Sequence, residues 1–396
     1  MYPTKKLWEV INIIRWVTYK PENVLENWWI ACFRTKNIQQ KLYESDIVYI
    51  EKNIVKNPEK FLKNWDILVS SANSLELLWK CCLIENLTYE ATLWWFITCF
   101  RSTEDINYKY FYYFYNSEKI QKIVRWFSRK TTWIANLQLT EVQNLPIPLP
   151  PLPTQQKIVF KLDSLFEKLD QSITLTKQNL ANIEELNKSI LEKIFKECEE
   201  KHEKRKLDEV STIITWNTPS TKFPEYYWWN ILWAWPTDIW DNKIINFTSK
   251  TLSQKWLIDW KARLVKKWSV LLVSIWTIWK VWIAWQDLTT NQQINSFEVN
   301  EKISWDFLYY FFQFYQKILK TLASKTVVPI INKTQCSQVL IPLPPLPEQQ
   351  KIVEYLDNIF AKNKILQEKY KQNLKNFEEL KQSILKQAFE NEDFIK

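Results

Sequence analysis

The chain has 396 residues, of which none is glycine and 24 are tryptophan. At average usage, a globular chain of this length contains roughly 28 glycines, about 7% of its residues. Glycine is the usual residue wherever a turn or a helix end needs a positive φ, because it lacks a Cβ atom. The absence of glycine conflicts with an ordinary globular fold and constrains every interpretation of the chain.

Tryptophan stands where glycine is typical. The triplets at residues 64–66 (Asn-Trp-Asp), 259–261 (Asp-Trp-Lys) and 267–269 (Lys-Trp-Ser) place it in a polar turn beside an apolar stretch. With glycine, the first two would be Asn-Gly and Asp-Gly hairpin signals. Four more recur every third residue of a β-rich stretch, at Trp276, Trp279, Trp282 and Trp285. Indole rings are too bulky for that spacing, so we expect most tryptophans to stand for glycine, encoded by a UGA codon that means glycine in the source organism.

Literal tryptophans at these turns would destabilise the fold. A bulky residue in the left-handed region costs on the order of 1–2 kcal/mol. Summed over roughly twenty sites, this exceeds the stability of a domain, about 5–15 kcal/mol. The alternative is a tryptophan-rich protein with a real aromatic stacking surface. We expect Trp233 to be a genuine tryptophan.

Length and composition limit the class of protein. A chain of this length predicts two or three domains, because one core rarely grows beyond about 250–300 residues. We see no signal peptide, and residues 269–285 are too short, and too polar with glycine in place of tryptophan, for a membrane span. Six cysteines without a C-x-x-C spacing and a single histidine argue against a metal site. We expect reduced core thiols and a cytoplasmic protein.

The net charge of +9 is unevenly distributed. The excess of lysine and arginine lies in residues 1–153 and 206–347, whereas residues 154–205 and 348–396 are neutral. Basic globular parts beside neutral linkers favour a polyanionic partner. A soluble basic surface without such a partner is the alternative.

A repeat with an offset of 194 residues organises the chain. Residues 148–153 (Pro-Leu-Pro-Pro-Leu-Pro) recur at 342–347, and Gln-Gln-Lys-Ile-Val follows each run in the same frame. The two halves also open alike, with Lys-Leu-x-Glu-Val at 6–10 and 206–210. These matches predict two copies of one unit, with four parts in chain order: a globular domain at 1–153, a helix at 154–205, a globular domain at 206–347 and a helix at 348–396.

Each segment after a proline run has the apolar spacing of a long helix, in steps of three and four residues. Because proline cannot continue a helix backwards, Thr154 and Glu348 should lie at or near the helix starts. We expect the helices to pair as an antiparallel coiled coil that also docks partners. The predicted contact residues are Leu162, Phe166, Leu169, Ile173 and Leu180 in the first helix, and Leu356, Phe360, Leu374, Phe377 and Ile384 in the second. A polyproline docking motif is the alternative for the proline runs.

The two globular parts are β-rich. Residues 63–71 and 266–274 predict matching hairpin strands, with apolar centres at 67–69 and 270–273. The aromatic stretches at 108–115 and 307–315 favour helices packed on the sheets, with their rings in the core. The predicted fold class is therefore α+β, with two β-rich domains joined by two long antiparallel helices in a pseudo-twofold repeat.

We find no catalytic motif. His202 lies in a charged run, which leaves a histidine-dependent triad unsupported. With glycine for tryptophan, residues 276–280 would be Gly-Thr-Ile-Gly-Lys, but valine follows where a phosphate-binding loop needs serine or threonine. No dinucleotide fingerprint, methyltransferase tetrapeptide or nuclease-like carboxylate cluster is present. The sequence indicates a binding protein.

Polar and basic stretches of the globular domains are candidate nucleic-acid contacts. Lysine and arginine suit phosphates, whereas arginine, asparagine and glutamine can read the edges of guanine and adenine. In the first domain the candidates are Arg34, Lys36, Asn37, Arg125, Arg129 and Lys130. In the second they are Thr237, Asp238, Lys261, Arg263, Lys280, Asn291 and Gln292. For each of them, an ordinary solvated surface residue is the alternative.

Over essentially its whole length, the chain resembles the DNA-specificity subunits of type I restriction–modification systems. The resemblance rests on Ile-Pro-Leu-Pro-Pro-Leu-Pro at 147–153 and 341–347, each followed by Gln-Gln-Lys-Ile-Val and a long helix. Residues 34–38 (Arg-Thr-Lys-Asn-Ile), 274–280 and 291–294 (Asn-Gln-Gln-Ile) add to it. The chain departs from the family where family glycines are tryptophan here.

The resemblance implies two target recognition domains that each read half of a bipartite, asymmetric DNA site. It implies a non-catalytic subunit whose helices dock two methyltransferase subunits, with restriction subunits completing the complex. S-adenosylmethionine, ATP and magnesium would then belong to those partners, and this chain would hold no cofactor. The alternatives are a standalone restriction or methylation enzyme with fused recognition domains, and a coiled-coil scaffold that does not bind DNA.

Overall fold

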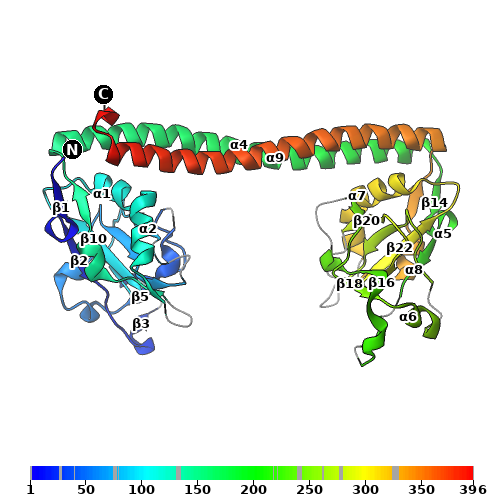
Figure 1. Cartoon of the computed structure of the whole chain (residues 1–396), viewed down its shortest axis with the longest axis horizontal. Helices are drawn as coiled ribbons and strands as arrows, with labels where there is room; N and C mark the ends of the chain where they lie inside the picture. Colours follow the sequence, from blue (N-terminus) through cyan, green and yellow to red (C-terminus); the bar gives the residue numbers. More distant parts are fainter. Residues whose placement is uncertain are drawn as a thin grey trace. The chain divides into compact units, whose positions relative to one another are not determined.

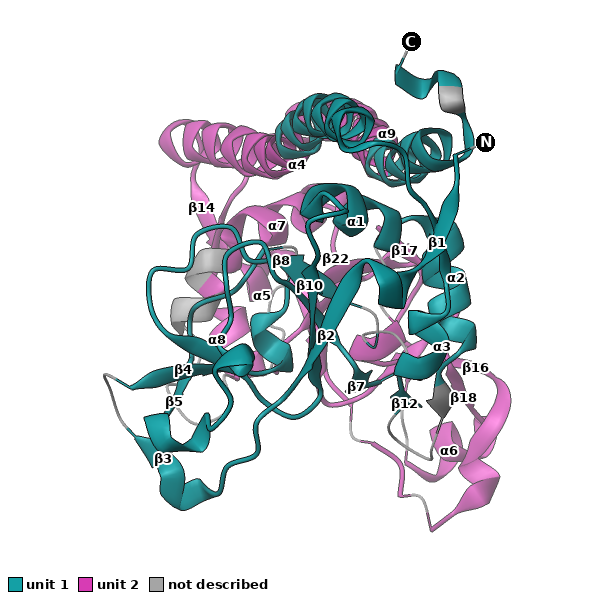
Figure 2. Ribbon diagram, turned by 90° about the vertical axis from the view of Figure 1, so that its left-hand side faces the viewer, with its two compact units in different colours: residues 1–176, 372–396 teal, residues 177–371 magenta. Residues whose placement is uncertain are grey.

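The computed structural model describes residues 2–395 except 26–28, 40, 75–77, 79, 131–134, 217, 221, 239–242, 261–262, 276–279 and 323–329. It divides into two compact units, Met1–Thr176 with Gln372–Lys396 and Lys177–Lys371 (Figure 2). Each unit contains one globular domain and parts of both long helices. Figure 1 labels several elements of each unit.

In the first unit, four small sheets carry the domain. The central antiparallel sheet has the order β2 (Ile11–Arg15), β10 (Ile97–Ser102), β6 (Ile67–Ser70) and β8 (Cys81–Leu83). A second sheet has the order β3 (Val24–Leu25), β5 (Val48–Ile50), β4 (Ile30–Phe33) and β9 (Ala91–Leu93). The remaining strands are β11 (Arg129–Lys130), β12 (Ala135–Asn136) and β7 (Ala72–Asn73), and the pair β1 (Thr4–Lys6) and β13 (Pro146–Pro148). The helices are α1 (Tyr108–Tyr115), α2 (Glu118–Trp126) and α3 (Leu139–Gln143).

The domain of the second unit has a similar plan. Its main sheet has the order β15 (Ser211–Ile214), β22 (Ile294–Val299), β19 (Val270–Val273), β20 (Val281–Ala284) and β17 (Ile244–Ile245). A second sheet has the order β18 (Lys250–Leu252), β16 (Tyr227–Ala234) and β21 (Thr289–Thr290), and β14 (Lys204–Lys206) pairs with β23 (Leu340–Pro342). The helices are α5 (Leu207–Val210), α6 (Gln254–Asp259), α7 (Trp305–Leu322) and α8 (Lys333–Ser337).

Short 3₁₀ helices lie between the other elements, and one, η8, follows α9 at the end of the chain. In the first unit they are η1 (Leu7–Glu9), η2 (Pro21–Asn23), η3 (Thr35–Asn37), η4 (Lys52–Ile54), η5 (Pro58–Lys60) and η8 (Glu392–Ile395). In the second they are η6 (Pro224–Tyr226) and η7 (Pro236–Asp238).

The predicted strands and aromatic helices are confirmed. The strands β6 and β19 are buried along their whole length, which explains their unbroken apolar runs. Helix α1 covers the predicted residues, and the side chain of Asn107 caps it by accepting a hydrogen bond from the backbone N–H of Tyr110 at 3.1 Å. The aromatic rings of α1 and α7 are mostly core residues, among them Phe111 and Phe311, which are fully buried.

The long helices α4 (Leu152–Lys201) and α9 (Leu346–Glu390) begin two residues before Thr154 and Glu348. This earlier start is possible because proline is tolerated in the first turn, where its missing N–H has no partner to lose. Pro153 and Pro347 therefore lie inside the helices.

Within each unit the helices run antiparallel and are held by polar contacts. In the first unit, Lys381 of α9 forms an ion pair of 3.5 Å with Asp170 of α4. In the second, Asn363 of α9 donates a hydrogen bond of 2.6 Å to Asn187 of α4. Paired asparagines inside an apolar helix contact favour one register.

The predicted helix-contact residues are buried to different degrees. Five of them belong to domain cores or pack against them in the first unit: Leu162, Phe166, Leu169, Phe377 and Ile384. In the second unit Leu356 and Phe360 do the same. The other three, Ile173, Leu180 and Leu374, are half-buried. The helix ends therefore serve the domain cores as well as the helix pair.

Among the described residues, five have a positive φ: Asp46, Trp65, Phe96, Trp228 and Trp268. The expectation of a left-handed backbone at roughly twenty tryptophans is therefore wrong for the described residues, where three tryptophans have one. Trp65 (φ 75°) and Trp268 (φ 69°) lie in two of the turns that the sequence marked. The hairpin predicted at 259–261 is wrong, because Ser253 caps α6 and Trp260 follows that helix with a φ of −98°. The buried Trp233 lies in β16 with 1% of its surface exposed.

Candidate nucleic-acid interface

In the first domain, the segment after β4 forms a polar loop around Asn37. The Asn37 Oδ1 accepts a hydrogen bond from the backbone N–H of Arg34 at 2.8 Å, and its Nδ2 donates to the carbonyls of Tyr43 at 2.8 Å and Ser45 at 3.4 Å. Asn37 is fully buried. Its amide shapes the loop from within, and Asn37 is not presented to solvent as a base-reading group.

The charged side chains of this loop lie around Asp46. The Nη2 of Arg34 is 3.3 Å from the Asp46 Oδ1, and the Lys36 Nζ forms an ion pair with the other carboxylate oxygen. Desolvation and the neighbouring Arg34 guanidinium lower the pKa of Lys36. Two cations thus share one carboxylate on a partly exposed loop, which leaves a net positive charge at the surface.

Two lysines near this loop, Lys41 and Lys80, were not among the residues predicted from the sequence. The Lys80 Nζ donates a hydrogen bond of 3.0 Å to the Gln39 Oε1, and both residues line a shallow pocket with Lys41 and Tyr43. Lys80 comes from a segment 41 residues along the chain from Gln39. No local pattern marks such a pairing, since only the tertiary fold creates it.

The second domain has a loop of the same design after β16. Asp238 at the end of η7 accepts hydrogen bonds of 2.9 Å from the backbone N–H groups of Trp235 and Ser249. Its side chain is buried, whereas Thr237 is exposed. Asp238 therefore corresponds to Asn37 as a loop-shaping residue, although the two loops differ in sequence.

Parallel strand pairing brings further predicted residues to this loop. β21 pairs parallel with β16, so the residues after it lie near η7, and the backbone N–H of Asn291 bonds the carbonyl of Ala234 at 3.4 Å. Asn291 is buried and bonds Gln293, but Gln292 is exposed and accepts a hydrogen bond from the Thr218 hydroxyl. Thr237 and Gln292 are thus the two predicted polar residues of this loop region that lie at the surface.

The loops of the two domains occupy the same place in their sheets. β4 pairs parallel with β9 in the first domain, as β16 does with β21 in the second. In each case the candidate residues follow the carboxyl ends of this parallel pair. Since the two loops differ in sequence, they present different donors and acceptors from equivalent positions.

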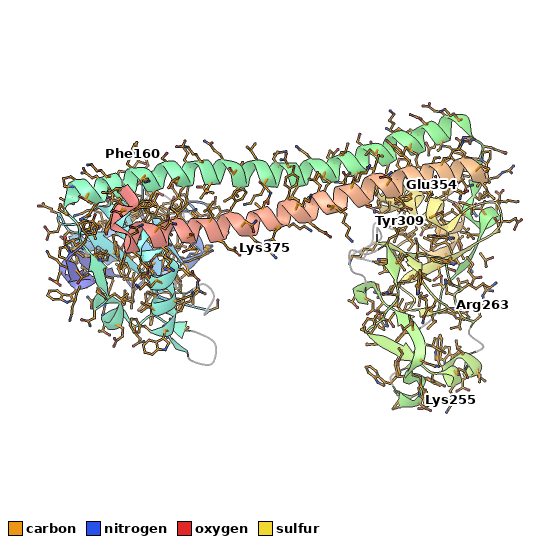
Figure 3. The ribbon with its side chains drawn as sticks, turned by 45° about the horizontal axis from the view of Figure 1, so that its top comes forward. Phe160, Lys255, Arg263, Tyr309, Glu354 and Lys375 are labelled. Atoms are coloured by element: carbon orange, nitrogen blue, oxygen red, sulfur yellow. The ribbon has the colours of Figure 1, made fainter. Side chains whose placement is uncertain are left out.

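The remaining predicted contacts lie on other elements. Arg263, which is labelled in Figure 3, forms an ion pair of 2.7 Å with Glu298. Lys280 is half-buried immediately before β20, and Arg125 is exposed in the last turn of α2. Arg129 and Lys130 make up the strand β11, and the structure describes their backbone but not their side chains. Lys261 lies outside the described residues.

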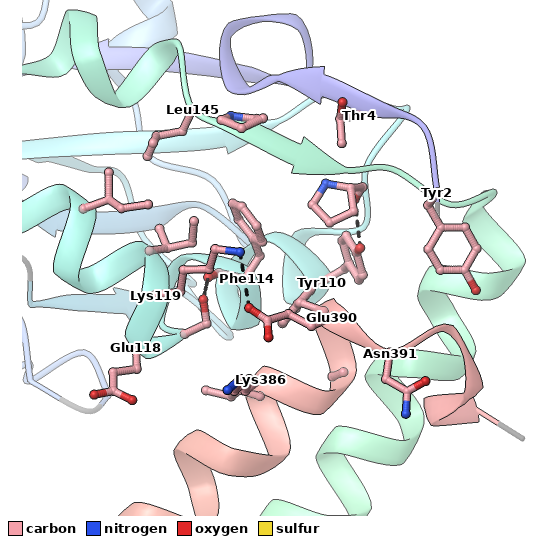
Figure 4. Close-up of a pocket in the computed structure, with 18 of the residues that line it drawn as sticks. Tyr2, Thr4, Tyr110, Phe114, Glu118, Lys119, Leu145, Lys386, Glu390 and Asn391 are labelled. Carbon is pink, nitrogen blue, oxygen red and sulfur yellow. Dashed lines mark hydrogen bonds and ion pairs between the residues drawn. The ribbon is translucent and has the colours of Figure 1, made fainter.

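A pocket of about 790 Å³ in the first unit contains none of the predicted DNA contacts (Figure 4). It lies between α2, the strands β1 and β13, and the end of α9. The Lys119 Nζ forms an ion pair of 3.2 Å with Glu390, and the Tyr110 hydroxyl donates to the carbonyl of Pro148 at 2.8 Å. These contacts tie the end of α9 to the domain.

The single histidine makes a polar contact and the cysteines are buried. The Nε2 of His202 lies 3.0 Å from Glu348, which joins the end of α4 to the start of α9. All six cysteines are free and buried, and burial raises the pKa of the Cys32 and Cys336 thiols to about 12. In the described parts of the chain, no three histidine, cysteine, aspartate or glutamate residues form a group able to hold a metal ion. No helix in those parts is long and apolar enough to span a membrane.

Solved structures share this fold. One from a study titled "Structural basis underlying complex assembly and conformational transition of the type I R-M system" superposes with a TM-score of 0.78 at 18% identity, covering 98% of both chains. The HsdS subunit of Thermoanaerobacter tengcongensis superposes with a TM-score of 0.58 at 18% identity, covering 98% of this chain and 97% of that one. At these identities the likeness concerns the fold.

Sequence comparison gives relatives that match about half of this chain. The type I restriction enzyme MjaIX specificity subunit of Methanocaldococcus jannaschii is 27% identical over 202 residues, 48% of this chain and 46% of that protein. The StySPI specificity subunit of Salmonella potsdam is 28% identical over 183 residues, 45% of this chain and 38% of that protein. The matched regions span less than half the length of these relatives.

The model of the "Type I restriction modification DNA specificity domain" matches residues 4–185 and again residues 199–376. Each match contains one globular domain and most of the long helix that follows it. The chain therefore belongs to the type I restriction–modification DNA specificity family and carries two copies of its domain.

Proposed function

We propose that this chain is the non-catalytic specificity subunit of a type I restriction–modification complex and that it reads a bipartite, asymmetric DNA target. One observation carries the proposal: two domain copies of this family place unlike polar loops at the same position, after a parallel strand pair. A protein with two different readers on one chain suits a target made of two different half-sites.

The side chains divide between affinity and readout. Lys36, Lys41 and Lys80 in the first domain are suited to phosphate oxygens, which carry most of the affinity for DNA. In the second domain, Thr237 and Gln292 are exposed polar groups of the kind that bonds base edges. Asn37 and Asp238 hold the loops in shape and act on DNA through them.

The family and the helix surfaces support a proposal for the partners. Large apolar side chains are exposed on the long helices, including Phe160 (Figure 3), Leu175, Tyr355 and Ile365. We assign this surface to methyltransferase subunits, of which two would dock, with restriction subunits completing the complex. S-adenosylmethionine, ATP and magnesium would be held by those partners in the cytoplasm, and this chain would supply no catalytic group.

Binding to duplex DNA tests the proposal. The chain is co-expressed with its methyltransferase subunit, and the dissociation constant for a mixture of random duplexes is measured by fluorescence anisotropy at several salt concentrations. We expect the logarithm of the association constant, the inverse of the measured dissociation constant, to fall linearly with the logarithm of the salt concentration. Salt-independent binding, or none in the presence of the partner, would support the scaffold alternative instead. Methyl transfer by the chain alone would support a standalone enzyme.

A further inference from the structure

The buried glutamines Gln155 and Gln349 tie the two domains to the long helices by the same set of bonds. They are 194 residues apart and both fully buried. The Gln155 Oε1 accepts a hydrogen bond of 2.8 Å from the backbone N–H of Asn107, the residue that caps α1. Its Nε2 donates to the carbonyls of Pro150 at 2.9 Å and Asp105 at 3.3 Å.

The second unit repeats this arrangement. The Gln349 Oε1 accepts a hydrogen bond of 2.8 Å from the backbone N–H of Ser304, immediately before α7. Its Nε2 donates to the carbonyls of Pro344 at 2.9 Å and Lys302 at 3.0 Å. In both units, one buried amide therefore bonds backbone groups of the proline run and of the domain loop, and the bonds to Pro150 and Pro344 are buried.

A carboxylate further along each helix makes a second tie. Asp163 accepts a hydrogen bond of 2.8 Å from the Lys109 Nζ and another from the Tyr113 hydroxyl. Asp357, again 194 residues later, accepts one of 2.6 Å from the Lys243 Nζ and another from the Tyr310 hydroxyl.

The lysines of these ties come from different elements. Lys109 belongs to α1, whereas Lys243 comes immediately before β17. The carboxylates, Asp163 and Asp357, are therefore equivalent positions of the repeat, whereas the lysines that bond them come from non-equivalent positions of the two domains.

An aromatic contact completes the set. Phe166 meets the ring of Tyr113 edge-on, with ring centroids 5.3 Å apart. Phe360 meets Tyr310 in the same way at 5.6 Å. We call Gln155, Asp163 and Phe166 the first bracket, and Gln349, Asp357 and Phe360 the second bracket.

From this repetition we infer that the two brackets are the positioning elements that make the protein discriminate the gap between its half-sites. The inference rests on the proposed function. Changing the gap by one base pair moves one half-site by about 3.4 Å and turns it by roughly 35° about the duplex axis. A domain that pivots on its helix tolerates such a change, whereas a domain held at a buried amide, a carboxylate and an aromatic ring does not.

The test compares substitutions of the bracket glutamines with the same substitution at the adjacent, exposed glutamines. Gln155→Met and Gln349→Met keep side-chain volume and remove the hydrogen bonds. Gln156→Met and Gln350→Met are the controls, because these adjacent glutamines are exposed. Should the methionine variants fail to fold, the hydroxyl-only pair Tyr113→Phe and Tyr310→Phe loosens the brackets more gently.

Binding is measured on the full complex with duplexes that carry the target selected by the wild-type protein, at its native gap and at gaps one base pair longer or shorter. The preference for the native gap is the ratio of the dissociation constants for the altered and the native gap. We expect this ratio to be at least roughly fivefold smaller in each bracket variant than in the wild-type protein, a difference that dissociation constants resolve well. The controls should keep that preference. An unchanged preference in the bracket variants overturns the inference.

A distance measurement keeps the inference separate from the proposed function. Spin labels at Lys56→Cys and Glu167→Cys report on the domain and the helix of the first unit, and both positions are exposed. Gln155→Met should broaden the distance distribution and Gln156→Met should not. If the wild-type complex shows no base preference, the proposed function fails, while an unbroadened distribution in Gln155→Met overturns the bracket itself.

Discussion

Trp65 and Trp268 occupy the same turn of the two domains. Each has a positive φ and precedes a buried strand, β6 or β19. Their backbone N–H groups donate to the carbonyls of Ile84 at 2.6 Å and Ala284 at 2.8 Å. The repeated backbone geometry is one that glycine adopts without steric cost and a larger residue does not.

We predict that Trp65→Gly and Trp268→Gly each stabilise the protein, by about 1 kcal/mol, because the left-handed backbone is freed of its Cβ clash. The stacking on Tyr108 and Trp305 that the indoles lose is a partly exposed contact and offsets only part of this gain. Urea unfolding of the purified variants measures the change.

Trp233→Gly is the matched control. The Trp233 side chain is almost completely buried, and the residue does not have a left-handed backbone conformation. We therefore expect the free energy of unfolding to fall by about 3–5 kcal/mol. Intact mass spectrometry of the protein from its source organism tests the recoding itself, because each glycine in place of tryptophan lowers the mass by a fixed amount. A mass that equals the printed sequence contradicts recoding.

We predict that Asn37→Ala destabilises the first domain by about 1–3 kcal/mol, because three backbone groups lose their buried partner. Denaturant unfolding measures the loss. Asn53→Ala is the control, since that asparagine is exposed and bonds only Glu51 among the hydrogen bonds described. Equal stability of the two variants would mean that Asn37 does not hold the loop.

We predict that Lys36→Ala and Lys80→Ala each weaken DNA binding about equally for all sequences and reduce the salt slope by about one. Lys20→Ala, which removes an exposed lysine paired with Glu22, should leave the slope unchanged. Anisotropy titrations at several salt concentrations give the slopes. A change in base preference without a change in the salt slope would contradict phosphate contact and indicate that these lysines contact bases.

We predict slow modification of the cysteines in the native protein at pH 8. Burial raises the pKa of Cys32, Cys81 and Cys336 to about 12, so little thiolate forms, and the side chains are out of reach of solvent. Iodoacetamide labelling followed by peptide mass spectrometry should therefore proceed quickly only in denaturant. Stability should fall as the pH rises above 9, since the unfolded thiols then ionise while the folded ones remain protonated.

Repetition and local pattern made much of the fold predictable. The proline runs located both long helices, and the unbroken apolar runs located β6 and β19. The aromatic stretch at Tyr108–Tyr115 located α1. These signals are local, so the sequence alone carries them.

The candidate interface was less predictable because it depends on tertiary packing. Asparagine and aspartate also bond nearby backbone groups, and the fold decides that Asn37 and Asp238 do so here. Lys80 meets Gln39 only through the folded domain. The helix α6 was missed because the Asp-Trp pair at its end suggested a hairpin, whereas Ser253 caps a helix.

Selection of bound duplexes from a random library, followed by sequencing, tests the central claim most directly. The complete complex is incubated with the library, and bound DNA is recovered and enriched over several rounds. We expect two different blocks of specified bases separated by an unspecified gap of constant length. A single contiguous block, a palindrome, or no enrichment would contradict the claim that two unlike recognition domains read a bipartite target.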